Sequence, residues 1–94
     1  MKIRWLPKAQ RDLEAELLRI AEENENTARH IATLIKEKTD LLGRFPETGR
    51  PGRIHETREL VLSGFPYILP YRVRKGAVEI LRFFHTAQNP PKIW

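Results

Sequence analysis

The sequence predicts an α+β fold in which a short strand and two amphipathic helices precede a small sheet. Apolar residues recur every three to four positions up to about residue 45, which is the spacing of helices with one buried face. Beyond residue 57 they alternate as in strands, and a segment rich in proline and glycine separates the two patterns. The predicted order is strand, helix, helix and three strands, in one domain spanning residues 1–94.

The first elements are a strand at residues 1–6 and a helix that begins at Pro7, because proline is favoured in the first turn of a helix. Charged residues fill most of the remaining positions of this helix. Its predicted buried face consists of Leu6, Ala9, Leu13, Leu17, Ile20 and Ala21.

A second helix is predicted after the Glu-Asn-Glu-Asn segment at residues 23–26, which interrupts the first pattern. We expect Asn26 to cap this helix, which starts at Thr27 and runs to about Arg44. Because the connection is short, the two helices should form an antiparallel hairpin.

Residues 45–56 are predicted to form a loop, since no periodicity survives among their prolines and glycines. Loops of this length without structure of their own are uncommon unless they are functional. The loop contains Gly-Arg-Pro-Gly-Arg at residues 49–53, so that Arg50 and Arg53 can present two guanidinium groups to a partner.

Three antiparallel strands are predicted at residues 58–62, 67–73 and 78–84. Pro70 cannot donate a hydrogen bond to a neighbouring strand, so we expect a bulge or an unpaired stretch there. The strands carry apolar side chains on both faces, whereas two helices can cover only one. An apolar and cationic surface on the other face would invite a partner.

The charge is unevenly distributed along the chain. The net charge is +5, yet residues 1–40 carry eight basic and eight acidic side chains, so the whole excess lies in residues 41–94. Such a field attracts a polyanion, either nucleic acid or an acidic protein segment, although it also serves solubility.

Several kinds of chemistry are excluded by composition. The chain has no cysteine, its three histidines are scattered, and no phosphate-binding glycine motif occurs, so we expect no metal site and no cofactor. The absence of cysteine, of a long apolar run and of an apolar leader favours a cytoplasmic location.

Metal-free phosphodiester cleavage remains possible, because it needs only a general acid, a general base and cations. The candidate catalytic residues are His85, Arg82 and Arg72, with Arg58 as a further cation. Glu56 or Glu59 is a possible base, and Tyr71 is a possible acid. Strand alternation puts Arg82 and His85 on opposite faces unless the strand ends or bulges between them. The alternative for the arginines is pairing with Glu59 and Glu79 across the sheet.

Four sequence blocks resemble the RelE/ParE superfamily of bacterial toxins. They are Phe-Pro-Glu-Thr-Gly-Arg-Pro-Gly at 45–52, Thr-Arg-Glu-Leu-Val-Leu at 57–62, Pro-Tyr-Ile-Leu-Pro-Tyr-Arg-Val at 66–73 and Glu-Ile-Leu-Arg-Phe-Phe-His-Thr-Ala-Gln at 79–88. The resemblance implies a βααβββ fold with a small antiparallel sheet and the helical hairpin on one face. It also implies a type II toxin-antitoxin module, of the kind that stabilises plasmids, with a cognate antitoxin encoded nearby.

The superfamily has two branches: RelE-like members cleave mRNA on the ribosome, whereas ParE-like members poison DNA gyrase. Ribosome-dependent nucleases of this group usually carry an arginine where Ile68 or Leu69 stands here, and several have a tyrosine near Thr86 and Ala87. These departures, together with the charge-neutral helices, favour the ParE-like branch.

The resemblance implies three possible roles. As a gyrase poison, the chain would bind its target through Arg50, Arg53, Arg58, Arg72 and Arg82. As an endoribonuclease, it would hold the phosphate with arginines and use His85 as acid or base. As an inactive toxin, it would serve only as a partner or co-repressor. The residues expected to bind the antitoxin are Leu60, Leu62, Phe84 and Trp94.

Overall fold

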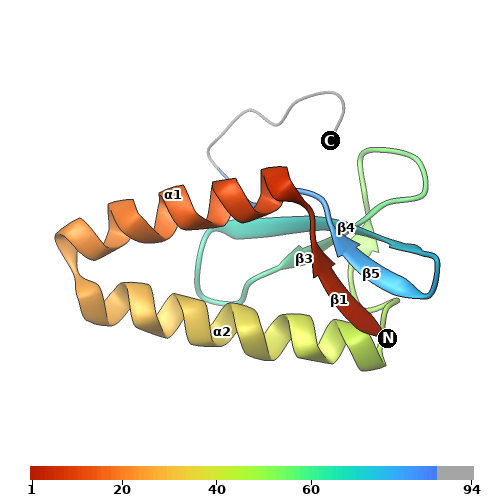
Figure 1. Ribbon diagram of the computed structural model, residues 1–94, viewed down its shortest axis with the longest axis horizontal. Coiled ribbons are helices and arrows are strands. Elements are labelled where there is room, and N and C mark those ends of the chain that lie inside the picture. Colours follow the sequence, from red (N-terminus) through yellow and green to blue (C-terminus); the bar gives the residue numbers. More distant parts are fainter. Residues whose placement is uncertain (87–94) are drawn as a thin grey trace.

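The predicted order of elements is confirmed by the computed structural model, which describes residues 1–86 (Figure 1). Two additional strands of two residues each occur, and the first of them lies inside the segment predicted as a loop. The elements are β1 (Lys2–Trp5), α1 (Pro7–Glu23), α2 (Glu25–Arg44), β2 (Arg50–Pro51), β3 (Arg58–Val61), β4 (Tyr67–Arg74), β5 (Ala77–Ile80) and β6 (Phe84–His85).

The sheet is mixed, although an entirely antiparallel sheet was the expectation. Its strands follow the order β1-β5-β4-β3-β2, and β6 pairs with β4. β3, β4 and β5 are antiparallel because short turns join them. β1 instead lies parallel to β5, with Lys2 opposite Ala77. The helices and the other strands separate these two strands in sequence, and a connection of that length permits parallel pairing.

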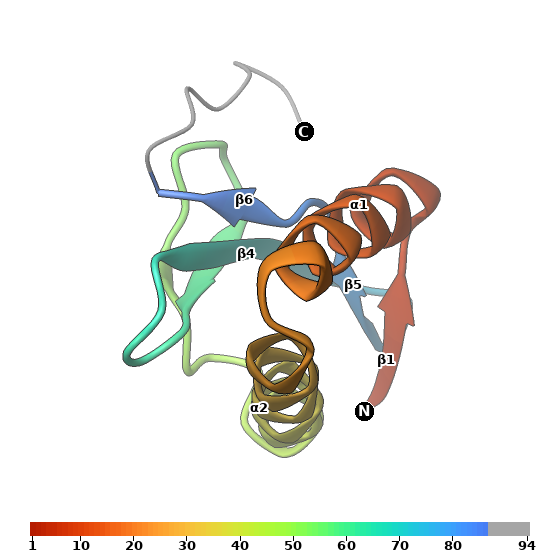
Figure 2. The same cartoon turned by 90° about the vertical axis from the view of Figure 1, so that its left-hand side faces the viewer.

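The two helices form the predicted hairpin and pack on one face of the sheet (Figures 1 and 2). Their buried face meets Leu69, Val78 and Ile80 of the central strands. Burial of apolar surface between these two layers is the main favourable contribution to folding. Among residues 1–86, no helix has both the length and the apolar character needed to span a membrane.

The cap of α2 is Asn24, two residues before the predicted Asn26. The Asn24 side-chain oxygen accepts a hydrogen bond from the backbone N–H of Thr27 at 3.1 Å. α2 therefore begins at Glu25, and Asn26 lies in its first turn. Both asparagines are suitable caps, and the extended backbone of Asn24, which also ends α1, decides between them.

The strand predicted at residues 78–84 is divided into β5 and β6 by a bulge. Between the paired residues of β5 and those of β6, residues 81–83 face only residues 69–70 of β4. Pro70 has no N–H to donate, while its carbonyl accepts a hydrogen bond from the N–H of Leu81 at 2.8 Å. β4 itself continues through Pro70, which pairs with Glu59 of β3, so the irregularity predicted at Pro70 lies instead in the segment that faces it, residues 81–83.

Candidate functional site

The face of the sheet away from the helices carries paired charges, and we call it the charged face. Residues directly opposite each other on neighbouring strands point to the same side of a sheet. Arg50 of β2 lies opposite Glu59 of β3, and Glu79 of β5 lies between Arg72 of β4 and Arg4 of β1. The alternative predicted for Arg72, pairing with Glu79 across the sheet, is confirmed.

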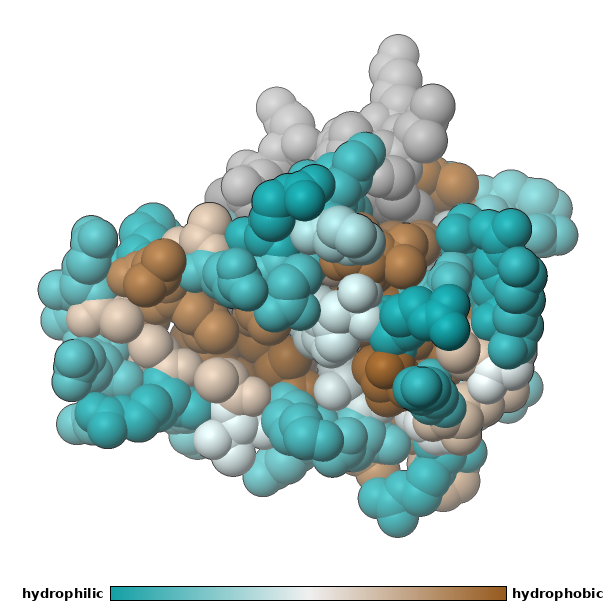
Figure 3. All heavy atoms as spheres, in the orientation of Figure 1, coloured by the Kyte–Doolittle hydropathy of each residue, from teal (hydrophilic) through white to brown (hydrophobic). Residues whose placement is uncertain are grey.

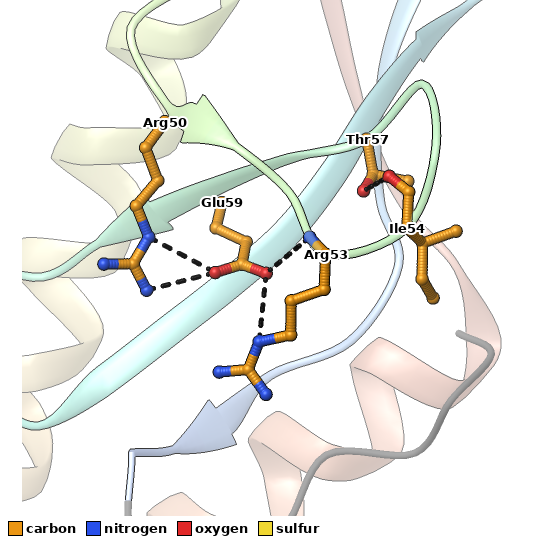
Figure 4. Close-up of polar contacts among 5 residues, drawn as sticks. All are labelled: Arg50, Arg53, Ile54, Thr57 and Glu59. Carbon is orange, nitrogen blue, oxygen red and sulfur yellow. Dashed lines mark hydrogen bonds and ion pairs between the residues drawn. The ribbon is translucent and has the colours of Figure 1, made fainter.

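Glu59 is the centre of the first group and is only 2% exposed. One carboxylate oxygen accepts hydrogen bonds from Arg50 at 3.1 and 3.3 Å. The other accepts one from the backbone N–H of Arg53 at 3.3 Å and lies 3.6 Å from the Arg53 guanidinium (Figure 4). Arg50 and Arg53, two of the five arginines predicted to bind a target, are thus half-exposed and bound to one buried carboxylate.

Glu79 is the central carboxylate of the second group, which also contains Arg72 and Arg4. The Arg72 guanidinium donates a hydrogen bond to Glu79 at 2.8 Å, and Arg4 lies 3.6 Å from its second oxygen. The hydrogen bond from Arg72 is the largest cause that lowers the pKa of Glu79, and the charges of Arg72, Arg74 and Arg4 add to it. Each group has two arginines and one carboxylate, so each keeps a net positive charge.

Arg58, also predicted to bind a target, is engaged with the backbone between α2 and β2. Its guanidinium donates hydrogen bonds to the carbonyl oxygens of Gly49 at 2.8 Å and Glu47 at 3.3 Å. Tyr71 holds the same segment from the core, donating to the Pro46 carbonyl at 2.7 Å and accepting from the Gly49 N–H at 2.8 Å. Both side chains therefore position this segment on the sheet.

The bulge directs Arg82 toward α1. Its guanidinium donates two hydrogen bonds to the Asp12 carboxylate, at 2.7 and 3.2 Å, and lies 4.7 Å from the centre of the Phe84 ring. Asp12 also accepts a hydrogen bond from the backbone N–H of Phe83 at 3.1 Å. This paired geometry ties the last part of the sheet to the first helix.

His85 lies near the next turn of α1. Its ring packs edge-on against Tyr67, with 5.4 Å between ring centroids, and the Tyr67 hydroxyl donates to Glu16 at 3.0 Å. Burial raises the pKa of Glu16, but hydrogen bonds from Arg19 and Tyr67 and the charges of Arg19 and His85 outweigh it and lower the pKa overall. Arg82 and His85 therefore both face α1, as the bulge permits.

The three residues of the nuclease hypothesis have different partners in the structure. Arg72 lies on the charged face with Glu79, whereas Arg82 is bound to Asp12 of α1 and His85 lies opposite Tyr67, whose hydroxyl reaches Glu16 of α1. A shared phosphate would need the guanidinium groups and the imidazole to converge on it. Within residues 1–86, no group of three histidine, aspartate or glutamate side chains is arranged to bind a metal ion.

The structure buries three of the four residues predicted to bind an antitoxin. Leu60, Leu62 and Phe84 are 6%, 2% and 6% exposed. Leu60 and Leu62 belong to the hydrophobic core, so the expected exposed surface does not contain them. Strand alternation alone could not tell which face the helices would cover. Trp94 lies outside the described residues.

A groove of about 550 Å³ opens where the start of α1 approaches the loop before β3, and we call it the basic groove. The residues that line it are Leu6, Pro7, Lys8, Arg11, Ile54, His55, Glu56, Thr57, Arg72 and Leu81. Lys8 and Arg11 were not predicted as binding residues, because the charges of residues 1–40 balance in number. The sequence feature that could have indicated them is the first turn of α1, because it has basic residues nearby and no acidic residue.

A second groove of about 490 Å³ lies between the two helices and is mostly apolar. Figure 3 shows this apolar surface between the hydrophilic outer sides of α1 and α2. Leu18, the most exposed large apolar side chain of the described chain at 68%, is part of it. The remaining lining residues are Glu14, Leu17, Ala21, Ala28, Arg29 and Ala32.

Comparisons with known proteins agree on one family. The family model described as ParE toxin of type II toxin-antitoxin system, parDE, matches residues 3–90. Y4kP of Sinorhizobium fredii is 40% identical over 98% of this chain and 95% of its own length. Toxin RelE2 of Caulobacter vibrioides is 34% identical over 89% and 93%. A chain of the chromosomal ParDE toxin-antitoxin system from P. aeruginosa superposes with a TM-score of 0.78, at 27% identity, over 90% of this chain and 95% of that one.

Proposed function

This chain belongs to the ParE toxin family of type II toxin-antitoxin systems, and we propose from that membership that it arrests bacterial growth by binding and poisoning DNA gyrase. We further propose that a cognate antitoxin neutralises it. The chain is a toxin of a ParDE-type system, and the family implies an antitoxin partner. The target and the mode of inhibition are the proposal.

The separation of the nuclease candidates is the observation that favours a binding toxin over an endoribonuclease. Metal-free cleavage needs an acid, a base and cations around one phosphate. Here Arg82 is held by Asp12 of α1, and Arg72 is held by Glu79 on the charged face. A toxin that acts by occupying its target needs no such convergence.

The charged face is the proposed contact surface for the target. Arg50, Arg53 and Arg72 lie there with partly exposed guanidinium groups that retain free N–H donors beyond their bonds to Glu59 and Glu79. Planar guanidinium groups in fixed orientations favour specific contacts with carboxylate or phosphate groups. Arg58 and Arg82 would support this surface by holding its edges in place.

The first experiment is pulse labelling in the minutes after the toxin is induced without an antitoxin. Thymidine incorporation should fall before methionine incorporation, and the purified chain should inhibit supercoiling by gyrase. An earlier fall in methionine incorporation would replace this proposal with mRNA cleavage. Normal growth after induction would indicate an inactive partner or co-repressor.

Substitution of His85 distinguishes the binding mechanism from the endoribonuclease mechanism. His85→Ala should inhibit growth about as strongly as the wild type, because no proton transfer is required of the imidazole. A cooperative thermal melt serves as the control, since His85 packs against Tyr67. A variant that folds like the wild type but no longer inhibits growth would contradict the binding mechanism.

A further inference from the structure

We propose that the basic groove binds an acidic, amphipathic segment of the antitoxin, with carboxylates at Lys8 and Arg11 and an apolar side chain on Leu6 and Ile54. This inference rests on the proposed neutralisation by an antitoxin and is independent of the gyrase target. It places antitoxin recognition at the start of α1 and the loop before β3.

Lys8 and Arg11 supply positive charge that the rest of the described chain does not neutralise. Both side chains are exposed, and neither has a hydrogen bond or ion pair with any residue from 1 to 86. Arg72, by contrast, reaches the groove while bound to Glu79. Among residues 1–86, the only carboxylate lining the groove is that of Glu56, so these residues give the basic groove an excess of positive charge.

The start of α1 strengthens the attraction for an anion. α1 begins at Pro7 without a side-chain cap and without an acidic residue in its first turn. The free N–H groups at the start of a helix and the helix dipole favour a negative charge there. Acidic side chains at the first turn of a helix normally supply that charge, and a partner's carboxylate can do so here.

The apolar part of the groove favours a peptide over a nucleic acid strand. Leu6, Pro7, Ile54 and Leu81 provide aliphatic surface beside the cations. No phenylalanine, tyrosine or tryptophan is among the described lining residues, and stacking on such rings is the usual way to hold unpaired bases. An apolar side chain flanked by carboxylates matches both parts of the groove.

The loop that forms one wall is held in place before any partner binds. Gly52 donates to the Thr57 carbonyl at 2.8 Å, and Thr57 donates through its N–H to the Ile54 carbonyl at 3.1 Å. Glu59 holds the backbone of Arg53 at the start of the same loop (Figure 4). Because the wall is already ordered, a partner pays less conformational entropy on binding.

The test compares three variants of the full-length toxin. Lys8→Gln/Arg11→Gln removes two charges from the groove, and Ile54→Ser removes apolar surface without changing charge. The matched control, Arg29→Gln/Lys36→Gln, removes two charges from exposed positions of α2. Thermal melts establish that each variant folds.

The probe is the purified product of the neighbouring antitoxin gene, and binding is measured by calorimetry. We expect about a tenfold weaker affinity for each groove variant, which corresponds to about 1.4 kcal/mol, and less than a twofold change for the control. In cells, both groove variants should still inhibit growth but need more antitoxin for rescue. Growth inhibition in the absence of an antitoxin depends only on the toxin's target. A failure of the gyrase proposal would therefore appear in the labelling and supercoiling experiments and not in the antitoxin affinity.

Three outcomes would overturn this assignment. Equal losses for the groove and control charge variants would indicate non-specific electrostatics. Displacement of the antitoxin from the groove by a single-stranded oligonucleotide, with no effect of Ile54→Ser, would indicate a phosphate-binding groove. Unchanged antitoxin affinity in both groove variants would place antitoxin recognition elsewhere.

Discussion

Three carboxylates each bind one or two of five arginines of this protein. Glu59 holds two arginines, Glu79 lies between two more, and Asp12 holds Arg82. An ion pair with a buried carboxylate fixes geometry, and loss of one partner leaves the other uncompensated. The arginines are thereby oriented, while their net charge on the charged face is reduced.

Glu79 should make stability depend on pH. Its pKa is lowered from the ordinary value of 4.5, chiefly by the hydrogen bond from Arg72, so its ionised form stabilises the folded state. That contribution is fully present above pH 4.5 and is lost as the pH falls through the lower pKa of the folded state. Urea denaturation between pH 3 and 7 should therefore show a weaker acid dependence for Glu79→Gln than for the wild type.

The control for this experiment is Glu23→Gln, because the Glu23 side chain is 78% exposed. That variant should keep the pH dependence of the wild type. Equal pH profiles for Glu79→Gln and Glu23→Gln would contradict a stabilising role for ionised Glu79.

Tyr71 should be needed for stability and not for chemistry. Its side chain is fully buried, burial is the main cause that raises its pKa, and its hydroxyl bonds both Pro46 and Gly49. Tyr71→Phe leaves a buried N–H and a carbonyl without partners, which should lower the free energy of unfolding by about 1 to 3 kcal/mol. Chemical denaturation measures this loss, and a midpoint equal to that of the wild type would contradict it.

The hairpin and the bulge are the elements that place the candidate site. The hairpin covers one face of the sheet and leaves the charged face uncovered by helices, and the bulge turns Arg82 toward Asp12. The bulge faces Pro70, which has no N–H to donate to that segment.

Packing of the hairpin predicts different effects for two apolar residues. Ile35 of α2 is 3% exposed, so Ile35→Ala should lower the free energy of unfolding by about 2 to 5 kcal/mol. Leu18 of α1 is largely exposed, and Leu18→Ala should change the free energy of unfolding by less than about 0.5 kcal/mol. Thermal or urea denaturation of both variants checks the contrast, and similar losses would show that the hairpin packs differently.

At the scale of the whole molecule, one core connects elements from both halves of the chain. Ala9 of α1, Ile35 of α2 and Ile80 of β5 belong to the same cluster, and β1 pairs with β5. We propose that the chain is a single domain, which should unfold in one step. Far-ultraviolet circular dichroism and tryptophan fluorescence should give coincident denaturation curves, and two separated transitions would show independent units.

The sequence predicted the order of elements, the helical hairpin and membership of the toxin family. It also predicted an irregularity at Pro70, but the bulge lies in the facing segment, residues 81–83. Helical and strand periodicity depend on residues only a few positions apart, so they are visible along the chain. The four sequence blocks indicated the RelE/ParE superfamily, and the departures from the nuclease pattern favoured its ParE-like branch. The match of the ParE toxin model over residues 3–90 confirms both.

Tertiary structure decided the parallel pairing of β1, the burial of Leu60 and Leu62, and the partner of each arginine. Arg82 and Asp12 lie 70 residues apart in the sequence, and no local pattern relates them. Conversely, Lys8 and Arg11 belong to a half of the chain that is neutral by count, yet no carboxylate of residues 1–86 pairs with them. Composition determines how many charges a chain carries, whereas only the fold brings distant residues together and decides which charges remain available to a partner.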